Sequence, residues 1–194
     1  MAFNKGLTMK RFFDVALVSL LLLMMAIPML FISFLVRITS QGPALYWSDR
    51  MGRHNIIFAM PKFRSMRMNT PAVATHLMAN SSEFMTPIGR FLRRSSLDEL
   101  PQLFSILKGD LSFVGPRPAL FNQDDLIMQR SELGVDQLMP GLTGWAQING
   151  RDELPISVKV KLDFEYLKKR SFMFDINILW LTFVRVLQRR GISH

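Results

Sequence analysis

The chain has 194 residues, of which 49% are hydrophobic and 20% charged, and 24 basic residues against 15 acidic ones leave a formal charge of +9. This length accommodates one compact domain, with or without a membrane segment, and excludes two large domains. The apolar content excludes a disordered chain, and the lack of any cysteine excludes disulfides, thiolate metal sites and cysteine nucleophiles. The positive charge predicts polyanionic partners such as phosphates, anionic lipid or nucleic acid.

Residues 15–36 form an apolar run without a charged side chain. As a straight helix this run would measure ~33 Å, against about 30 Å for the hydrocarbon core of a bilayer, so it is long enough to span. Pro28 lies inside the run. Because proline removes a helical hydrogen bond and clashes with the preceding turn, we expect a kink in the membrane segment near residues 26 and 27.

Basic residues flank this run on both sides. Positively charged flanks stay on the cytoplasmic side, and both can do so only if the helix enters and leaves the membrane by the same face. We therefore predict a re-entrant membrane helix over residues 1–37 and a domain over residues 38–194 on the cytoplasmic face. A straight span is the alternative. The flanking residues are Lys5, Lys10 and Arg11 on one side and Arg37, Arg50 and Arg53 on the other.

The remainder predicts an α+β fold that is mostly helical, a compact helical domain with a small β-hairpin. Short strands at residues 43–47 and 56–60 surround Gly52 and indicate the hairpin. Thr86 is expected to cap the short helix that follows, with Pro87 in its first position.

Three further helices are predicted. Apolar residues at helical spacing indicate a helix over residues 98–107, which Gly109 ends. Residues 156–169 also look helical, with charge on one side. Residues 172–187 are too few and too interrupted to span a bilayer, and they predict an interfacial amphipathic helix.

Asp98 and Glu99 differ from the other carboxylates because they lie at a predicted helix start, directly after Arg93 and Arg94. The positive end of the helix and the two arginines are expected to keep a carboxylate ionised, and an ionised aspartate is a competent nucleophile toward phosphorus. Glu99 is a candidate to share Mg²⁺, which prefers carboxylate and phosphate oxygens. The alternative is that both acids simply occupy a first helical turn, as acids commonly do.

Several cations are candidates for phosphate binding. Arg117 lies between two prolines, which restrict its backbone and favour a fixed anion contact. Arg93, Arg117 and Arg151 can each fork onto phosphate oxygens, and Lys62 and Arg64 add two more cations. Each residue taken singly is also typical of a surface or membrane-facing charge. Together with the carboxylate pair, they indicate chemistry on a membrane-bound phosphate.

Five motifs resemble those of the monotopic phosphoglycosyl transferases, a family of bacterial sugar transferases. The resemblance covers nearly the whole chain, from the apolar helix to about residue 190, in the short form of the family. The motifs are KFRSM at 62–66, LDELPQL at 97–103, KGDLSFVGPRP at 108–118, PGLTGWAQ at 140–147 and NGR at 149–151.

This resemblance implies transfer of a sugar 1-phosphate from a UDP-sugar to polyprenyl (undecaprenyl) phosphate, with release of UMP and a requirement for Mg²⁺. The reaction is expected at the bacterial inner membrane, with membrane lipid as a partner and no nucleic acid. By position, Asp98 would form a covalent sugar-phosphoryl aspartate, and Glu99 would assist with the metal or the lipid phosphate. The phosphate- or nucleotide-binding residues are expected to be Lys62, Arg64, Arg93, Arg117, Arg151 and Asp175.

One departure from the family stands at the kink, where members commonly have Ser-Pro and this chain has Ile27-Pro28.

The alternative function is a membrane-anchored basic module that binds anionic lipid or nucleic acid without catalysis. The alternative mechanism is a one-step transfer in which Glu99 acts as a base on the lipid phosphate. An N-acetylated hexosamine is the expected sugar, with galactose and glucose as open alternatives.

Overall fold

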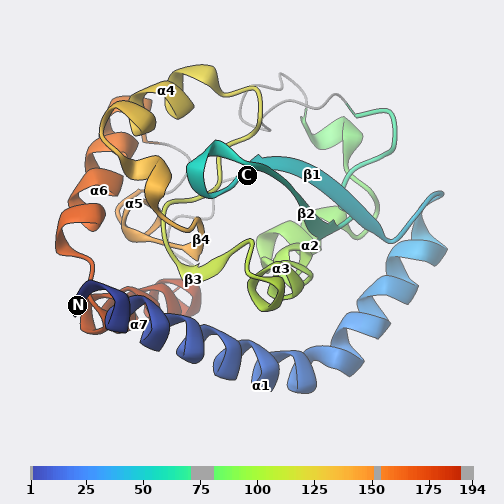
Figure 1. Cartoon of the computed structure of the whole chain (residues 1–194). Coiled ribbons are helices and arrows are strands. Elements are labelled where there is room, and N and C mark those ends of the chain that lie inside the picture. The colour runs from blue at the N-terminus through green and yellow to red at the C-terminus, as the bar shows by residue number, and fades with distance from the viewer. Residues whose placement is uncertain (1, 71–80, 151–153, 189–194) are drawn as a thin grey trace.

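The structure is a computed structural model that describes residues 2–70, 81–150 and 154–188. It is mostly helical, with a small antiparallel hairpin, as the sequence predicts. The first element is α1 (Ala2–Thr39), which remains helical through Pro28. Figure 1 shows α1 bending part-way along, so that a first arm lies beside α7 (Phe172–Leu187) and a second arm rises towards the hairpin. A bend in a helix that contains proline is the expected consequence of the missing hydrogen bond.

The first arm of α1 packs on the domain through polar and apolar contacts. Val18 is fully buried in the main core together with Ile106. The guanidinium of Arg11 donates to the carbonyls of Ile106 and Leu107, at 2.6 and 2.8 Å, near the end of α3 (Gln102–Lys108). These carbonyls belong to the last turn of a helix, where no backbone amide is available to them. Arg11 thus fastens the first arm to α3.

The second arm packs on a different part of the same domain. Ile32 and Val36 are buried against Phe63 and Leu92, which belong to the hairpin and to α2 (Gly89–Arg94). Both arms of α1 therefore pack on the part of the chain that follows this helix.

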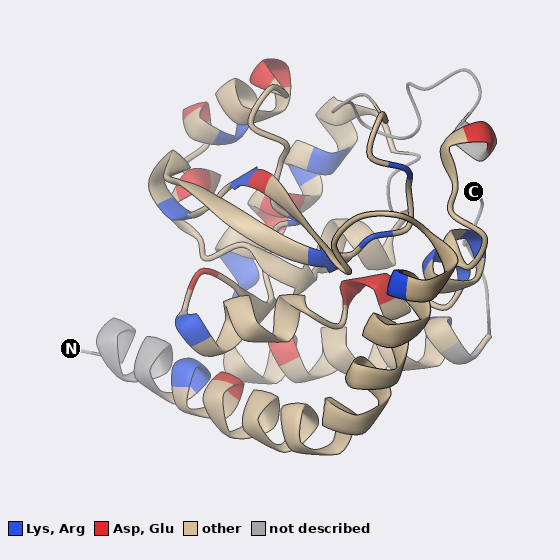
Figure 2. Ribbon diagram, turned by 90° about the vertical axis from the view of Figure 1, so that its right-hand side faces the viewer, with Lys and Arg blue, Asp and Glu red and all other residues tan. Residues whose placement is uncertain are grey.

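The middle of α1 is apolar and exposed. Among the residues that the structure describes, one helical stretch, Met9–Thr39, is long and apolar enough to cross a membrane by length and composition. Large apolar side chains project from it, among them Phe12, Leu23, Ile27 and Leu30, and Figure 2 shows no charged residue in the middle of this helix. A soluble domain rarely exposes so continuous an apolar surface, so this face is suited to lipid.

The predicted hairpin is confirmed, with slightly longer strands. β1 (Leu45–Met51) and β2 (Ile57–Phe63) pair antiparallel, and residues 53–55 form the turn. His54 and Asn55 both adopt positive φ there, a conformation that asparagine tolerates better than most residues. Phe58 and Met60 of β2 are buried in the main core, which fixes the face of the hairpin that lies on it, whereas Phe63 on the opposite face is buried against the second arm of α1.

A second, parallel pair of strands was not expected from the sequence. β3 (Ser112–Val114) pairs with β4 (Gly141–Thr143), bringing together the GPRP and PGLTG motifs. Gly115 and Gly141 lie so close that a side chain on either would collide with backbone, which explains both glycines. The remaining helices are α4 (Asp124–Glu132), α5 (Trp145–Ile148) and α6 (Ile156–Lys169).

The helices predicted over 156–169 and 172–187 are confirmed as α6 and α7. The helix predicted over 98–107 is divided into a 3₁₀ turn, Leu97–Glu99, and α3, with Pro101 at the N-cap of α3 and Gly109 ending it in a left-handed conformation. The expected cap at Thr86 is wrong. Its hydroxyl instead donates to the carbonyl of Ser65, which joins this segment to the end of β2.

Candidate active site

Asp98 and Glu99 lie in the 3₁₀ turn between α2 and α3. Ser96 adopts the left-handed conformation (φ 56°) just before them, and Pro101 follows. The backbone is thus restricted on both sides of the turn: Ser96 redirects the chain before it, and the ring of Pro101 fixes the backbone after it. Contrary to the sequence expectation, the two acids precede the N-terminus of α3 by one short turn.

Glu99 is the anchored carboxylate of the pair. Its Oε1 accepts hydrogen bonds from Lys62 Nζ at 2.9 Å and from Arg117 Nη2 at 2.8 Å. Burial alone would raise the pKa of Glu99, but the charges and hydrogen bonds of Arg117 and Lys62 outweigh burial and hold that pKa far below its usual range. Glu99 is therefore ionised at neutral pH.

Asp98 has a different environment although it is the adjacent residue. Its side chain is 6% exposed, and burial raises the pKa of Asp98 to about 6, with Glu99 acting in the same direction and Lys62, Arg93 and Arg117 opposing it. The sequence predicted a carboxylate held firmly ionised. The structure shows a carboxylate whose desolvation outweighs its surrounding cations, and which still carries its charge for most of the time at pH 7.

Arg93 faces the same carboxylates from the end of α2. Its Nε donates to Ser65 Oγ at 3.1 Å, and its Nη2 lies 3.4 Å from Met66 Sδ. Burial lowers the pKa of Arg93, while Asp98 and Glu99 raise it. Lys62, Arg93 and Arg117 are thus brought around the acidic pair from β2, α2 and the loop after β3.

Arg64 does not join this group, and its prediction as a phosphate ligand is not supported by its contacts. The side chain is buried, and its guanidinium donates to Ser40 and to the carbonyls of Gln41 and Gly42 in the link from α1 to β1. Those carbonyls follow the end of α1 and need donors. Arg64 therefore ties the second arm of α1 to the hairpin.

Asp175 is likewise placed away from the role expected of it. It forms an ion pair with Lys10 of α1 and accepts a hydrogen bond from the hydroxyl of Tyr166 at 2.7 Å. Lys10 also donates to the carbonyl of Val114 at 2.9 Å. Asp175 is buried, so this set of contacts joins α1, α6 and α7 to β3 and has the geometry of a structural network.

Arg151, another predicted phosphate ligand, lies outside the described residues. Within the described ranges, no group of three or more histidine, aspartate or glutamate side chains is arranged to hold a metal ion. Asp98 and Glu99 still fit a magnesium ion, because Mg²⁺ in phosphate-transfer sites takes one or two protein carboxylates and completes its shell with phosphate oxygens and water.

Two residues near the site escaped the sequence analysis. Arg130 of α4 forms an ion pair with Asp163 of α6 at 2.6 Å and donates to the carbonyl of Arg117 at 2.8 Å. Burial raises the pKa of Asp163, and Arg130 opposes that effect. The sequence shows Asp163 only as one of several charged residues in the helix over residues 156–169. That pattern does not reveal that the Asp163 side chain is buried.

Comparison with known proteins gives a consistent result. The family model described as "Bacterial sugar transferase" matches residues 5–189. The chain is 38% identical to an undecaprenyl-phosphate galactose phosphotransferase of Salmonella typhimurium, over 94% of this chain and 41% of that protein. It is also 38% identical to an uncharacterized sugar transferase of Bacillus subtilis, over 95% of this chain and 90% of that protein.

A third relative is the UDP-glucose:undecaprenyl-phosphate glucose-1-phosphate transferase of Escherichia coli, at 38% identity over 90% of this chain and 39% of that protein. The chain thus spans about two fifths of the length of the Salmonella and Escherichia relatives. The matched range, residues 5–189, spans the acidic pair, the cations around it and nearly all of α1. This chain belongs to the bacterial sugar transferase family.

Proposed function

We propose that this chain transfers a sugar 1-phosphate from a UDP-sugar to undecaprenyl phosphate and releases UMP, through a covalent intermediate on Asp98. The names of the relatives support the overall reaction, since two of them act between undecaprenyl phosphate and a sugar phosphate. The observation that carries the mechanism is the division between the two carboxylates. Glu99 takes the ion pairs of Lys62 and Arg117, whereas Asp98 is buried with a pKa raised to about 6.

This division suits two roles. A carboxylate that is already bound by two cations is a poor nucleophile, because its electron density is committed to those contacts. A desolvated carboxylate with a raised pKa is more basic and more nucleophilic, and it remains ionised for most of the time at pH 7. We therefore assign the attack on phosphorus to Asp98 and the orientation of the cations to Glu99.

The reaction then has two displacements at one phosphorus atom. First, an oxygen of Asp98 forms a bond to the β-phosphorus of the UDP-sugar, and the bond from that phosphorus to the bridging oxygen breaks, so that UMP leaves with the electron pair. Second, an oxygen of undecaprenyl phosphate attacks the same phosphorus and releases the Asp98 carboxylate. The products are UMP and undecaprenyl diphosphate sugar, and no oxidant or additional proton donor is required.

The cations around Asp98 and Glu99 favour both displacement steps. Each step brings one anion to another, and direct approach of two phosphates is repulsive. Lys62, Arg93 and Arg117 lie around the acidic pair, so they are placed to offset this repulsion and to stabilise charge on the transferring phosphoryl group. Mg²⁺, when bound by Asp98 or Glu99 together with the diphosphate, would supply further neutralisation of that charge.

The shape of α1 supports a re-entrant membrane helix, with the domain on the cytoplasmic face of the bacterial inner membrane. Its two arms contact the same domain through Arg11 and Val36, while the middle of the helix exposes apolar side chains. A straight span would carry one arm to the opposite side of the bilayer. The site is therefore held at the membrane surface, where a polyprenyl phosphate presents its head group while its tail stays in lipid.

The chemical proposal is tested with detergent-solubilised protein, a panel of UDP-sugars and Mg²⁺. We expect release of UMP with at least one sugar, and an intact protein mass increased by one sugar phosphate when the lipid acceptor is omitted. Asp98→Asn should lose both signals, and Asp125→Asn, an exposed aspartate on α4, should keep both. UMP release from Asp98→Asn at the wild-type rate would eliminate the covalent mechanism. The same panel identifies the sugar, for which an N-acetylated hexosamine is expected.

The membrane topology is tested by cysteine labelling, since the native chain has no cysteine. Single substitutions Asn4→Cys and Gln41→Cys place one thiol near each end of α1. In spheroplasts, a membrane-impermeant maleimide added outside should label neither, whereas in inverted vesicles it should label both. Labelling of one end from each side would establish a straight span.

A further inference from the structure

Arg130 and Asp163 form a buried ion pair near Asp98 and Glu99 but not in contact with them. Arg130 Nη2 lies 2.6 Å from Asp163 Oδ2, and Arg130 Nε lies 3.0 Å from the same oxygen. Their side chains are 11% and 1% exposed. The pair joins α4 to α6, two elements that supply none of the groups in contact with the acidic residues described above.

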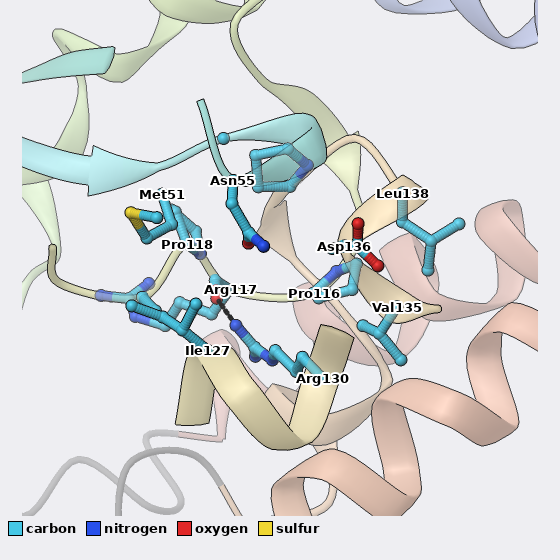
Figure 3. Close-up of a pocket in the computed structure, with 13 residues that line it drawn as sticks. Met51, Asn55, Pro116, Arg117, Pro118, Ile127, Arg130, Val135, Asp136 and Leu138 are labelled. Carbon is cyan, nitrogen blue, oxygen red and sulfur yellow. Dashed lines mark hydrogen bonds between the residues drawn. The ribbon is translucent and has the colours of Figure 1, made fainter. Parts of the chain in front are cut away.

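The Arg130 guanidinium also contacts the loop that carries Arg117. Arg130 Nη1 donates to the carbonyl of Arg117 at 2.8 Å (Figure 3), and Arg117 Nη2 donates to Glu99 at 2.8 Å. A continuous series of hydrogen bonds therefore runs from Asp163 through Arg130 to the backbone of Arg117, and from the Arg117 side chain to Glu99.

The sequence around Arg117 explains why its carbonyl needs such a contact. Pro116 and Pro118 flank it, and proline has no backbone N–H, so neither neighbour can be held by donating to another element. The loop must be fixed through its carbonyl oxygens. Arg130 holds the carbonyl of Arg117, and Arg50 Nη1 lies 3.3 Å from the carbonyl of Pro118.

Arg130 packs behind the loop that carries Arg117. A small open pocket lined by the flanking prolines, Arg117, Arg130 and Asn55 lies beside this loop (Figure 3). The Nε, Nη1 and Nη2 atoms of Arg130 are all engaged, by Asp163 and by the Arg117 carbonyl.

We propose that Arg130, clamped by Asp163, is a positioning residue that fixes the backbone of Arg117 so that the Arg117 guanidinium stays on Glu99 and on the substrate phosphate. This inference rests on the proposed function and extends it to residues outside the acidic site. Misplacing a catalytic group by about 1 Å costs about 100-fold in rate, so a contact that acts only on the loop backbone has a large effect on turnover.

Arg130→Lys is the most direct test, because it keeps the charge next to Asp163 and therefore favours a folded protein. One ammonium cannot reproduce the fork that reaches both the carboxylate and the Arg117 carbonyl. We expect kcat/KM for UMP release to fall about tenfold or more, with the melting temperature little changed. Arg53→Lys is the matched control, since Arg53 also donates to a backbone carbonyl, that of Gln137, and should keep kcat/KM within about twofold of wild type.

A double-mutant cycle separates positioning from a merely structural role. If Arg130 acts through Arg117, then Arg130→Lys should have little further effect, less than about threefold, in a chain that already carries Arg117→Gln. If the ion pair only stabilises the contact of α4 with α6, the two losses multiply, and the inference is overturned. Asp163→Asn removes the charge that holds Arg130, so in a cycle with Arg117→Gln it should give the same result as Arg130→Lys.

A second measurement does not depend on activity and so distinguishes this inference from the proposed function. In protein labelled with ¹⁵N-arginine, the Arg117 Nε–H signal is identified by its loss in Arg117→Gln. Arg130→Lys should move that signal towards the position of exposed arginines, and Arg53→Lys should not. An unmoved signal would refute the positioning role even if UMP release is confirmed. A moved signal without UMP release would support it and reject the proposed reaction.

Discussion

Replacing Asp98 by asparagine should stabilise the folded protein at neutral pH while abolishing the covalent intermediate. The reason is the burial of this carboxylate. Its pKa is raised from the ordinary value of 3.8 to about 6, mainly by desolvation, so the charged form is less favourable in the folded chain than in the unfolded chain. A neutral amide of the same size does not incur this penalty.

The magnitude follows from the two pKa values. The difference between 3.8 and about 6 corresponds, at 1.36 kcal/mol per pH unit, to about 3 kcal/mol. Since the side chain is 6% exposed, solvent screening reduces this value little. For a chain of this size, each kcal/mol changes the melting temperature by about 2–4 °C. Asp98→Asn should therefore melt about 6–12 °C above wild type at pH 7.5.

The gain in stability from Asp98→Asn should depend on pH. Above about pH 6, Asp98 is ionised in both states, and the folded wild type carries the full penalty. As the pH falls through about 6 towards 3.8, the folded state takes up a proton that the unfolded state does not, so wild-type stability rises relative to Asp98→Asn. The difference between the two proteins should shrink through this window and vanish below it.

The assay is thermal unfolding in one detergent, without Mg²⁺, at several pH values between 4 and 8. Asp125→Asn, exposed on α4, controls for the loss of one negative charge from a strongly basic chain. Equal melting temperatures for wild type and Asp98→Asn at pH 7.5, or a less stable variant, would refute the argument that desolvation dominates at Asp98.

Glu99→Gln leaves Lys62 and Arg117 without their carboxylate, so kcat/KM for UMP release should fall about 100-fold or more, while exposed Glu132→Gln should have little effect. Arg64→Met should lower the melting temperature but leave KM for the UDP-sugar within about twofold, because Arg64 binds backbone carbonyls and not the acidic site. Asp175→Asn should lower the free energy of unfolding by about 2–3 kcal/mol, measured by denaturant titration, because it leaves the partly buried Lys10 without its partner.

Local patterns determined much of this protein from the sequence alone. The one-sided charge of residues 156–169 and the apolar stretch of residues 172–187 predicted α6 and α7 with their correct bounds, and two short strands around Gly52 indicated the hairpin. The uncharged run with Pro28 indicated a bent apolar helix. These features depend on residues that are neighbours in the chain, so a pattern of spacing is sufficient to predict them.

Position in the chain was a poorer guide to the roles of single side chains. Lys62 and Arg64 are two residues apart, yet Lys62 binds Glu99 whereas Arg64 binds the end of α1, because β2 ends at Phe63 and its regular alternation ends with it. Asp175 was placed with the phosphate ligands by its motif, but it faces Lys10, which lies 165 residues away in sequence.

The chemistry of the site was decided by the tertiary structure. Adjacent residues, Asp98 and Glu99, have pKa values shifted in opposite directions because burial raises both, and only Glu99 accepts hydrogen bonds from two cations of separate elements that outweigh it. The contact of Arg130 with the Arg117 carbonyl likewise exists only because α4 and α6 pack together. Charge interactions depend on distance in space and on access to water, and neither quantity is encoded in the spacing of residues along the chain.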